Sequence, residues 1–304
     1  MDQNPRKALF VGRPSIDFTT IVDRMPVGDE KTVAKRHAVS FGGNATTAAF
    51  CCAKLGNKPD LMGAIAEDWL GRMFRDMAND YGIRLHERRT RETAFSQIMP
   101  KDGLRAIVRC RDEEDDAEYP ILDAHEFYTL HLDGHQPDAA IYYAKAFREN
   151  GRLTSLDGGS MRSNTTELLD FIDVGVVSER LCEQMRLEIG GMLEMLRSKG
   201  CRVGAVTLGE KGLYWFDGRS DIRHMPAIPV PDERVIDTNG AGDIFHGAYI
   251  YSYLRRPHQS WGDNFDFARH AAALSVQHLG NEASLPKRAN IEAAMRARPI
   301  AVGE

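Results

Sequence analysis

Short apolar runs alternate along the chain with longer segments in which apolar residues recur every three or four positions. The short runs predict strands at residues 7–12, 59–66, 127–134, 152–159, 174–178 and 202–209. The longer segments predict helices at residues 44–56, 68–82, 138–151 and 179–200. Strands and helices that alternate this regularly are typical of βαβ units. We therefore predict an α/β fold with a mostly parallel central sheet and helices on both faces.

Two segments, 13–40 and 93–111, break this alternation. The first is polar, rich in β-branched residues and without a helical period, and the second resembles two strands joined by a Lys-Asp-Gly turn. We predict that both form a small β-structured flap over the main sheet; a pair of surface hairpins is the alternative. The basic stretch 84–91 is expected at the surface, and residues 257–266 are expected to form a loop.

Composition and charge narrow the class of protein. Of the 304 residues, 42% are hydrophobic and 27% are charged, which provides enough apolar material for a substantial core. The net charge of -5 at pH 7 lacks the basic surplus of a nucleic-acid-binding protein. No apolar run approaches the roughly 20 residues of a membrane span, and no signal peptide is visible. We expect a single cytoplasmic domain over residues 1–304 with no nucleic-acid or membrane partner.

The stretch 235–254 carries the strongest candidate for chemistry. A short apolar run, predicted to be a strand, ends at Asp237 and is followed by Gly240-Ala241-Gly242, Asp243 and an apolar helix. In open α/β sheets, ligands bind at the carboxyl ends of strands. Backbone N–H groups of a glycine turn and of the helix start can converge on one concavity there. This turn therefore predicts a binding site for a phosphate or another oxyanion.

Asp243 stands directly behind this anion site. A carboxylate repels the anion, but it can accept the proton of a hydroxyl that attacks the bound phosphoryl group. The spacing alone leaves a second interpretation equally open, in which Asp243 only favours the positive end of the helix dipole. Walker, dinucleotide-binding, G-x-S-x-G and H-E-x-x-H motifs are absent from the sequence.

The segment DTNGAGDIFHGA resembles the C-terminal signature of the phosphofructokinase B (PfkB)/ribokinase family of carbohydrate kinases. Three more segments, SFGGNATTAAFCCAKLG, AVTLGEKGLYWF and GNEASLP, resemble family segments in the family's order. The GGN triplet is closer to the ketohexokinase-like branch. The resemblance implies a ribokinase-like three-layer α/β/α fold with a small β lid formed by residues 13–40 and 93–111. It also implies an ATP-dependent sugar kinase that requires Mg2+.

The resemblance assigns a role to each matching position. Asp243 becomes the catalytic base, with Gly240, Ala241 and Gly242 as the anion hole. The sugar is assigned to Asp17, Gly42, Gly43 and Asn44, and the nucleotide to Thr207, Gly209, Gly212 and Asn239. Asp237 would lie near the monovalent-cation (K+) site of some members, and Glu179 would reach magnesium through water. The lid often forms a homodimer contact in this family.

Several alternatives stay open at this stage. A nucleoside kinase of the same fold would need an apolar or aromatic pocket near Asp17, and a sugar-binding or sensing protein without catalysis would lack turnover. Among lid residues, Arg13, His37, Arg105 and Arg109 are candidates for reading a phosphate or sulfonate on the sugar. His246 is expected to pack against the sheet.

Overall fold

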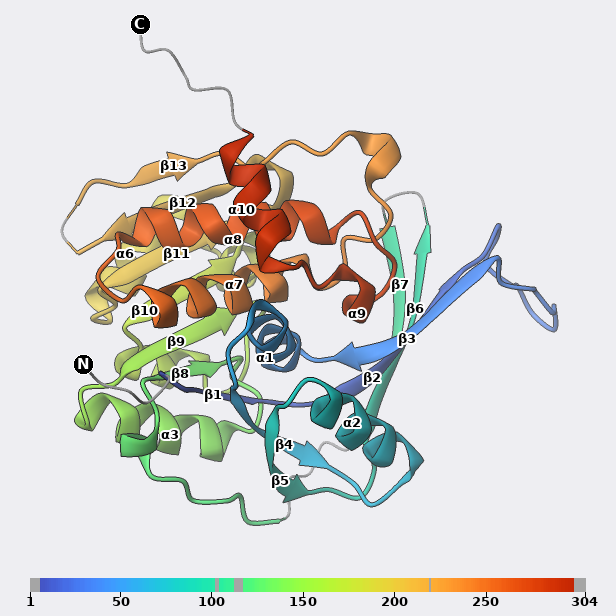
Figure 1. Cartoon of the computed structure of the whole chain (residues 1–304), viewed down its shortest axis with the longest axis horizontal. Coiled ribbons are helices and arrows are strands. Elements are labelled where there is room, and N and C mark those ends of the chain that lie inside the picture. The colour runs from blue at the N-terminus through green and yellow to red at the C-terminus, as the bar shows by residue number, and fades with distance from the viewer. Residues whose placement is uncertain (1–5, 102–103, 112–116, 219, 298–304) are drawn as a thin grey trace, which may run out of the picture.

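A nine-stranded sheet runs through the centre of the protein (Figure 1). The computed structural model describes residues 6–101, 104–111, 117–218 and 220–297. The strand order is β13-β12-β11-β10-β9-β8-β1-β4-β5. The strands are β1 (Ala8–Gly12), β4 (Asp60–Ile65), β5 (Arg84–Arg89), β8 (Thr129–Leu132), β9 (Leu153–Gly158), β10 (Val174–Ser178), β11 (Val203–Thr207), β12 (Leu213–Asp217) and β13 (Arg223–Met225). All pairs from β5 to β11 are parallel, and β12 pairs antiparallel with both β11 and β13.

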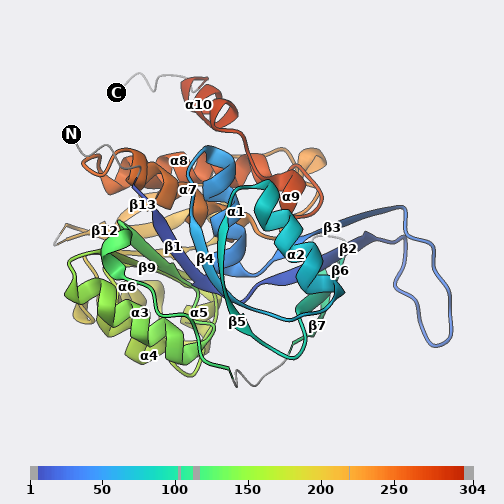
Figure 2. The same cartoon turned by 60° about the horizontal axis from the view of Figure 1, so that its bottom comes forward.

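Helices cover both faces of this sheet and bury two separate cores (Figure 2). The residues of β1 alternate between them: Ala8 and Phe10 face one core, and Leu9 and Val11 face the other. The first core contains α1 (Asn44–Leu55), α2 (Trp69–Asp80), α7 (Ala241–Arg255), α8 (Trp261–Ser275) and α10 (Arg288–Arg296). The second contains α3 (Pro137–Glu149), α4 (Thr165–Leu168), α5 (Glu179–Met185) and α6 (Ile189–Ser198). The predicted three-layer α/β/α arrangement is confirmed.

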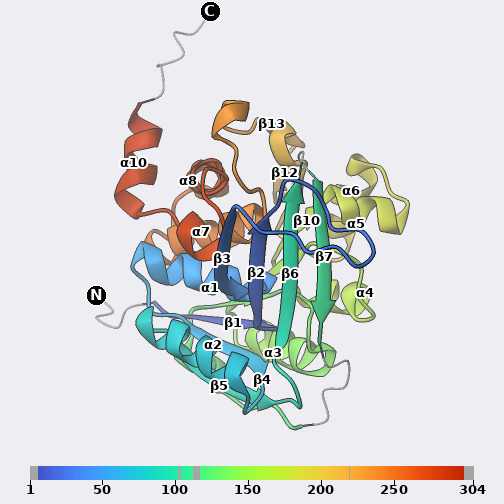
Figure 3. The ribbon, with the colours of Figure 1, turned by 90° about the vertical axis from the view of Figure 1, so that its right-hand side faces the viewer.

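The two segments that break the alternation form a second sheet, which stands beside the carboxyl ends of the central strands (Figure 3). It contains β2 (Ser15–Ile21), β3 (Arg36–Gly42), β6 (Ala94–Lys101) and β7 (Leu104–Cys110), in the order β3-β2-β6-β7. The predicted turn at residues 102–103 lies outside the described residues. The register pairs Asp17 with Ser96, and Ser96 with Arg109. Because directly paired residues share a face, these three side chains form one row across the sheet.

Four sequence-based expectations need correction. Residues 235–237 form no strand, because the Ile236 and Asp237 N–H groups both bond to Val276 O after α8. The predicted helix 179–200 is two helices, since Arg186 adopts a left-handed conformation (φ 57°) between α5 and α6. The predicted loop 257–266 is helical from Trp261 onward.

The basic stretch 84–91 was expected at the surface, but it contains the edge strand β5, in which one arginine is buried. Arg88 is 3% exposed, and its guanidinium donates to Asp138 Oδ1 at 2.8 Å and Oδ2 at 2.9 Å. The bidentate pair replaces the water that the buried charge has lost. Arg84 and Arg89 do face solvent, as expected.

The helices α1 and α7 pack against each other at very short range. A Cβ added to Gly247 of α7 would overlap the Ala48 backbone and approach the Cys51 Cβ to 2.7 Å on α1. Only a glycine lets the two backbones approach this closely. The contact matters for the site because α1 begins at Asn44 and α7 begins just before Asp243.

We predict that Gly247→Ala lowers the free energy of unfolding by about 1–3 kcal/mol, because the extra methyl group overpacks the α1–α7 contact. Gly190→Ala on α6 is the matched control, since nothing lies within 4 Å of the added Cβ. Chemical denaturation measures both. A Gly247→Ala protein as stable as the control variant would contradict this packing account.

Candidate active site

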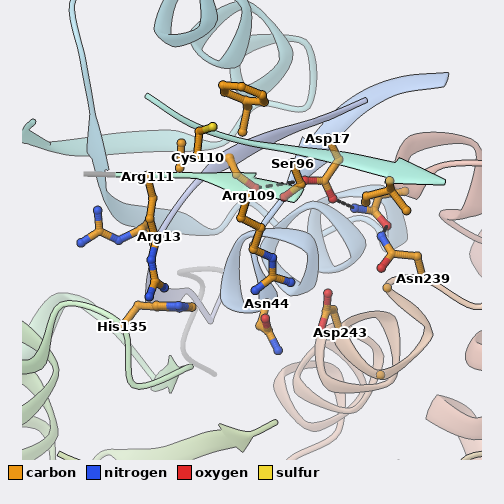
Figure 4. Close-up of a pocket in the computed structure, with 18 of the residues that line it drawn as sticks. Arg13, Asp17, Asn44, Ser96, Arg109, Cys110, Arg111, His135, Asn239 and Asp243 are labelled. Carbon is orange, nitrogen blue, oxygen red and sulfur yellow. Dashed lines mark hydrogen bonds between the residues drawn. The ribbon is translucent and has the colours of Figure 1, made fainter. Parts of the chain in front are cut away.

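A cavity of about 270 Å3 lies between the second sheet, the carboxyl end of β1 and the start of α7 (Figure 4). Ligands of open α/β folds bind at this end of the strands. Its lining includes Arg13, Ser15, Asp17, Gly43, Asn44, Phe95, Ser96, Ile98, Arg109, Arg111, His135, Asn239, Gly240, Gly242, Asp243 and Asn281. The volume is at the small end for ligand pockets, which favours a small molecule of about monosaccharide size.

The glycine turn forms one wall of the cavity and begins α7. Gly240 has φ 73°, and a Cβ there would overlap the Asn281 side chain, so the turn requires glycine. Ile244 N–H bonds to Gly240 O at 2.8 Å, which leaves the preceding N–H groups at the open end of the helix. These N–H groups and the helix dipole make this wall suitable for a phosphoryl group.

Asp237 fixes this turn from behind. Its buried carboxylate accepts the Asn239 N–H at 2.9 Å and the Gly280 N–H at 3.2 Å. The preceding residues therefore form a hydrogen-bonded loop instead of the strand that the apolar run suggested. In this structure, Asp237 orients Asn239 and Gly240 toward the cavity.

Asp243 projects from the first turn of α7 into the same cavity (Figure 4). Its side chain is partly exposed to the cavity and otherwise surrounded by protein. Burial raises the pKa of this carboxyl group well above its ordinary value, and the negative charges of Asp157, Asp133 and Asp17 raise it further. The positive charge of Arg109 acts in the opposite direction. A carboxylate with a raised pKa is a stronger proton acceptor, as a general base requires.

Asp17 lies opposite Asp243, on β2 of the second sheet. Its Oδ1 accepts the Ser15 hydroxyl at 3.2 Å, and its Oδ2 accepts the Asn281 amide at 3.2 Å. Burial raises the Asp17 pKa, and the hydrogen bonds from Ser96, Ser15 and Asn281 partly offset this effect. A Cβ on Gly42 would overlap the Asp17 carboxylate, so Gly42 makes room for this side chain although it does not itself line the cavity.

Asn44, the first residue of α1, sits above two buried acids. Its amide donates to Asp157 Oδ2 at 3.1 Å, and the next residue's N–H donates to Asp133 Oδ2 at 3.1 Å. Asp133 also accepts the His135 N–H at 2.9 Å. The two carboxylates at the ends of β8 and β9 therefore hold the start of α1 and contribute negative potential beneath the cavity.

Of the four residues expected at the nucleotide, only Asn239 lines this cavity. Thr207 ends β11, and Gly209 begins the loop that leads to Gly212 and β12; none of the three lines the cavity. Gly209 is exposed, with nothing within 4 Å of an added Cβ, so a ligand could approach its backbone. Glu179, at the start of α5, does not line the cavity either. Among the described residues, no group of three or more His, Cys, Asp or Glu side chains could hold a metal ion by itself.

The structure thus brings Asp17, Gly43, Asn44, Asn239, Gly240, Gly242 and Asp243 into one cavity, with Gly42 and Ala241 beside them. Asn281 was missed as a site residue, although its segment GNEASLP had been singled out. Its N–H donates to Ser40 Oγ at 3.2 Å and its amide to Phe41 O at 2.8 Å.

Only some of the four basic lid candidates line the cavity. Arg13 and Arg109 line the cavity, whereas His37 is exposed and does not, and the Arg105 side chain lies outside the described part of the structure. Arg111 and His135, which the sequence did not single out, line the cavity as well. His246 is buried and its Nδ1 lies 2.9 Å from the Tyr249 hydroxyl, in agreement with the packing expected for it.

In the described part of the chain, no helix is both long and apolar enough to pass through a membrane. Over residues 5–288, the chain matches the model of the pfkB family carbohydrate kinases. It is 25% identical to a ribokinase of Lactococcus lactis over 301 residues, covering 95% of this chain and 97% of the relative. It is 23% identical to a nucleoside kinase of Methanothermobacter thermautotrophicus, covering 92% of this chain and 93% of the relative.

A solved structure gives the same result for the fold. The structure of Arabidopsis thaliana ribokinase complexed with ribose and ATP superposes with a TM-score of 0.79 and 25% identity, covering 97% of this chain and 100% of that one. The resemblance extends through both layers of helices and the second sheet, because almost the whole of each chain is covered. This chain therefore belongs to the pfkB family of carbohydrate kinases.

Proposed function

We propose that this protein transfers the γ-phosphoryl group of ATP to a hydroxyl group of a sugar or sugar-like substrate. The observation that carries the proposal is the placement of Asp243, the glycine turn and Asp17 around one small cavity. Family membership and the ribokinase structure complexed with ribose and ATP support the assignment of both substrates.

The roles follow from the chemistry of each wall. Asp17, Asn44 and Asn281 can orient the acceptor through hydrogen bonds to its hydroxyl groups. Asp243 takes the proton of the reacting hydroxyl as its oxygen attacks phosphorus. The N–H groups of Gly240, Ala241 and Gly242 stabilise the charge on the transferred phosphoryl group.

ATP and Mg2+ fit the residues that the structure offers. The exposed Gly209 loop after β11 leaves backbone accessible to the nucleotide, and Thr207 at the end of β11 precedes it, whereas Gly212 is buried. We assign Asn239 to the nucleotide from the side of the glycine turn. Mg2+ generally binds through phosphate oxygens, water and one or two carboxylates, so it needs no acidic cluster in the protein. Glu179 is the carboxylate that we assign to it, through water. Bound Mg2+ would neutralise phosphate charge, and a K+ ion would bind beside the loop of Asp237.

We further propose that residues 1–304 form one domain in which the second sheet is a lid. Closure of the lid would exclude water from the reacting groups and limit hydrolysis of ATP. Val39, Ile107 and Val108 leave apolar surface exposed on this sheet, where a second copy could pack to form a homodimer. We expect the enzyme to act in the cytoplasm.

A nucleoside is the second candidate acceptor, because Phe95 and Ile98 line the cavity near Asp17 and could contact a base. The test is ADP release from MgATP with pentoses, hexoses, sugar phosphates and nucleosides, with and without K+. Turnover with a sugar supports the proposal, and turnover with nucleosides alone selects the second candidate. Tight sugar binding without turnover would identify a non-catalytic sensor.

We predict that Asp243→Asn lowers kcat by at least about 10²-fold, because the amide cannot accept the proton, while the affinity for ATP changes little. Asp76→Asn, at an exposed position of α2, is the matched control and should keep full activity. Steady-state kinetics and nucleotide titration give both quantities. Turnover of Asp243→Asn close to that of the control would remove Asp243 from the role of base.

The raised pKa of Asp243 also predicts the pH dependence. Below that pKa the carboxyl group is protonated and cannot act as a base, so the rate should fall on the acid side at a pH above the ordinary carboxylic-acid range. Arg109→Met removes a charge that lowers this pKa and should move the fall to higher pH. Asp17→Asn removes a charge that raises it and should move the fall to lower pH. Single-turnover rates against pH measure this, and identical profiles in all three proteins would contradict the electrostatic account.

We predict that Asp17→Ala raises the apparent KM for the acceptor about 10–100-fold, because hydrogen bonds to a charged group contribute about 1.5–3 kcal/mol. The effect on the KM for ATP should be small, since Asp17 lies on the second sheet, away from the expected nucleotide loop. Asp23→Ala, an exposed position beyond the end of the same strand, is the control. An unchanged acceptor KM in Asp17→Ala would count against the sugar site.

A further inference from the structure

Basic side chains gather at one end of the cavity. Arg13, Arg111 and His135 lie together at the end remote from Asp243 and Asn239, and Arg109 lies between the two ends (Figure 4). They come from separate elements: Arg13 follows β1, His135 follows β8, and both other arginines belong to β7 or the residue after it. Three distant parts of the sequence thus place basic side chains at one site.

The electrostatics of a neighbouring group support this clustering. Arg162 donates to Asp133 O at 2.9 Å beside the same end of the cavity. Burial lowers the pKa of Arg162, and the positive charges of Arg111 and Arg109 lower it further. The negative charges of Asp133 and Asp157 act in the opposite direction. The acids that line the cavity itself, Asp17 and Asp243, lie toward the other end. The cavity therefore has a basic end and an acidic, reacting end.

The position of the basic end separates it from the expected nucleotide loop. Arg13 follows β1, whereas Thr207 and Gly209 follow β11. The strand order places β1 four strand spacings from β11, which corresponds to about 19 Å at the usual distance between strands. The γ-phosphoryl group already has its own binding wall at the glycine turn. The basic end thus faces the part of the acceptor that does not react.

We propose that the acceptor is an anionic sugar: a monosaccharide that carries a phosphate, sulfonate or carboxylate group at the end opposite the hydroxyl that is phosphorylated. This inference rests on the proposed function and deepens it. Arg13 and Arg111 bind the anionic group, since a guanidinium donates paired hydrogen bonds in a geometry that matches such oxyanions. His135 adds a further polar contact.

The experiment compares matched acceptors on the full-length protein. A neutral hexose is measured beside its 6-phosphate, its 6-sulfonate and its uronate, and kcat/KM is determined for each with saturating MgATP. We expect at least one anionic member to exceed the neutral hexose by about 10²-fold or more, because several charge-assisted hydrogen bonds are involved. The best member identifies which anionic group is recognised.

Charge-removing variants test whether the arginines cause the preference. In Arg13→Met and Arg111→Met, the ratio of kcat/KM between anionic and neutral sugars should fall about 10-fold or more, with unchanged KM for ATP. Arg109 is left intact because its charge also acts on Asp243. Arg84→Met, exposed at the amino end of β5, is the control and should keep the wild-type ratio. Any of three results would overturn the inference: the wild-type protein prefers neutral acceptors, both variants keep the wild-type ratio of kcat/KM, or the variants raise the KM for ATP instead of changing this ratio.

Failure of the proposed function gives a different result. If neutral sugars are phosphorylated in an Asp243-dependent reaction and anionic ones are not, the kinase assignment stands and the anion site is wrong. If no acceptor is phosphorylated, calorimetry with hexose 6-phosphate decides. Binding that weakens in Arg13→Met and Arg111→Met then supports the anion site without the kinase, and the absence of binding overturns it.

Discussion

The geometry of this site depends on one asparagine that joins two parts of the fold. Asn281 donates through its side chain to Asp17 and to Phe41 O on the second sheet, and its Oδ1 accepts the Asn239 amide of the glycine turn at 3.4 Å. Gly240 is held against the same side chain so closely that no Cβ would fit. Because Asn281 is 2% exposed, the loss of either partner would leave buried polar atoms unsatisfied. The proposed acceptor wall and the proposed phosphoryl wall are thereby held in fixed positions relative to each other.

Around this link, the cavity concentrates charge of both signs. Asp133 and Asp157 lie at the ends of adjacent strands, beneath the start of α1. Burial raises the pKa of Asp243, and the charges of these two acids and of Asp17 raise it further. Arg13, which follows β1, and Arg111, which follows β7, supply positive charge at the other end. Burial of charged groups costs stability, and hydrogen bonds such as those that Asp133 accepts from the Ala45 and His135 N–H groups offset this cost. A site that must activate a hydroxyl and also bind phosphates requires this separation of charge.

Much of the fold could be predicted because the central strands are buried on both faces and therefore appear as short apolar runs. The apolar run at 235–237 wrongly predicted a strand. In the structure, the Ile236 and Asp237 N–H groups bond to Val276 O, and the Asp237 carboxylate accepts two backbone N–H groups. These hydrogen bonds hold the segment in a loop. The glycine turn could be recognised in the sequence because Gly240 to Asp243 are consecutive residues. The Asn281 contact to Asp17 spans 264 positions, and no local pattern reports such a pairing. Arg111 and His135 lie just beyond strand ends, where periodicity no longer indicates which way a side chain faces.

The most direct test of the central claim is a crystal structure of the protein with ADP, aluminium fluoride, Mg2+ and an acceptor that supports turnover. The account predicts that the fluoride group, in place of the transferred phosphoryl, lies about 2.7–3.1 Å from N–H groups of Gly240, Ala241 or Gly242. It also predicts that the acceptor oxygen lies within hydrogen-bond distance of Asp243. A fluoride group bound away from the glycine turn, or an acceptor hydroxyl that contacts another base, would contradict it.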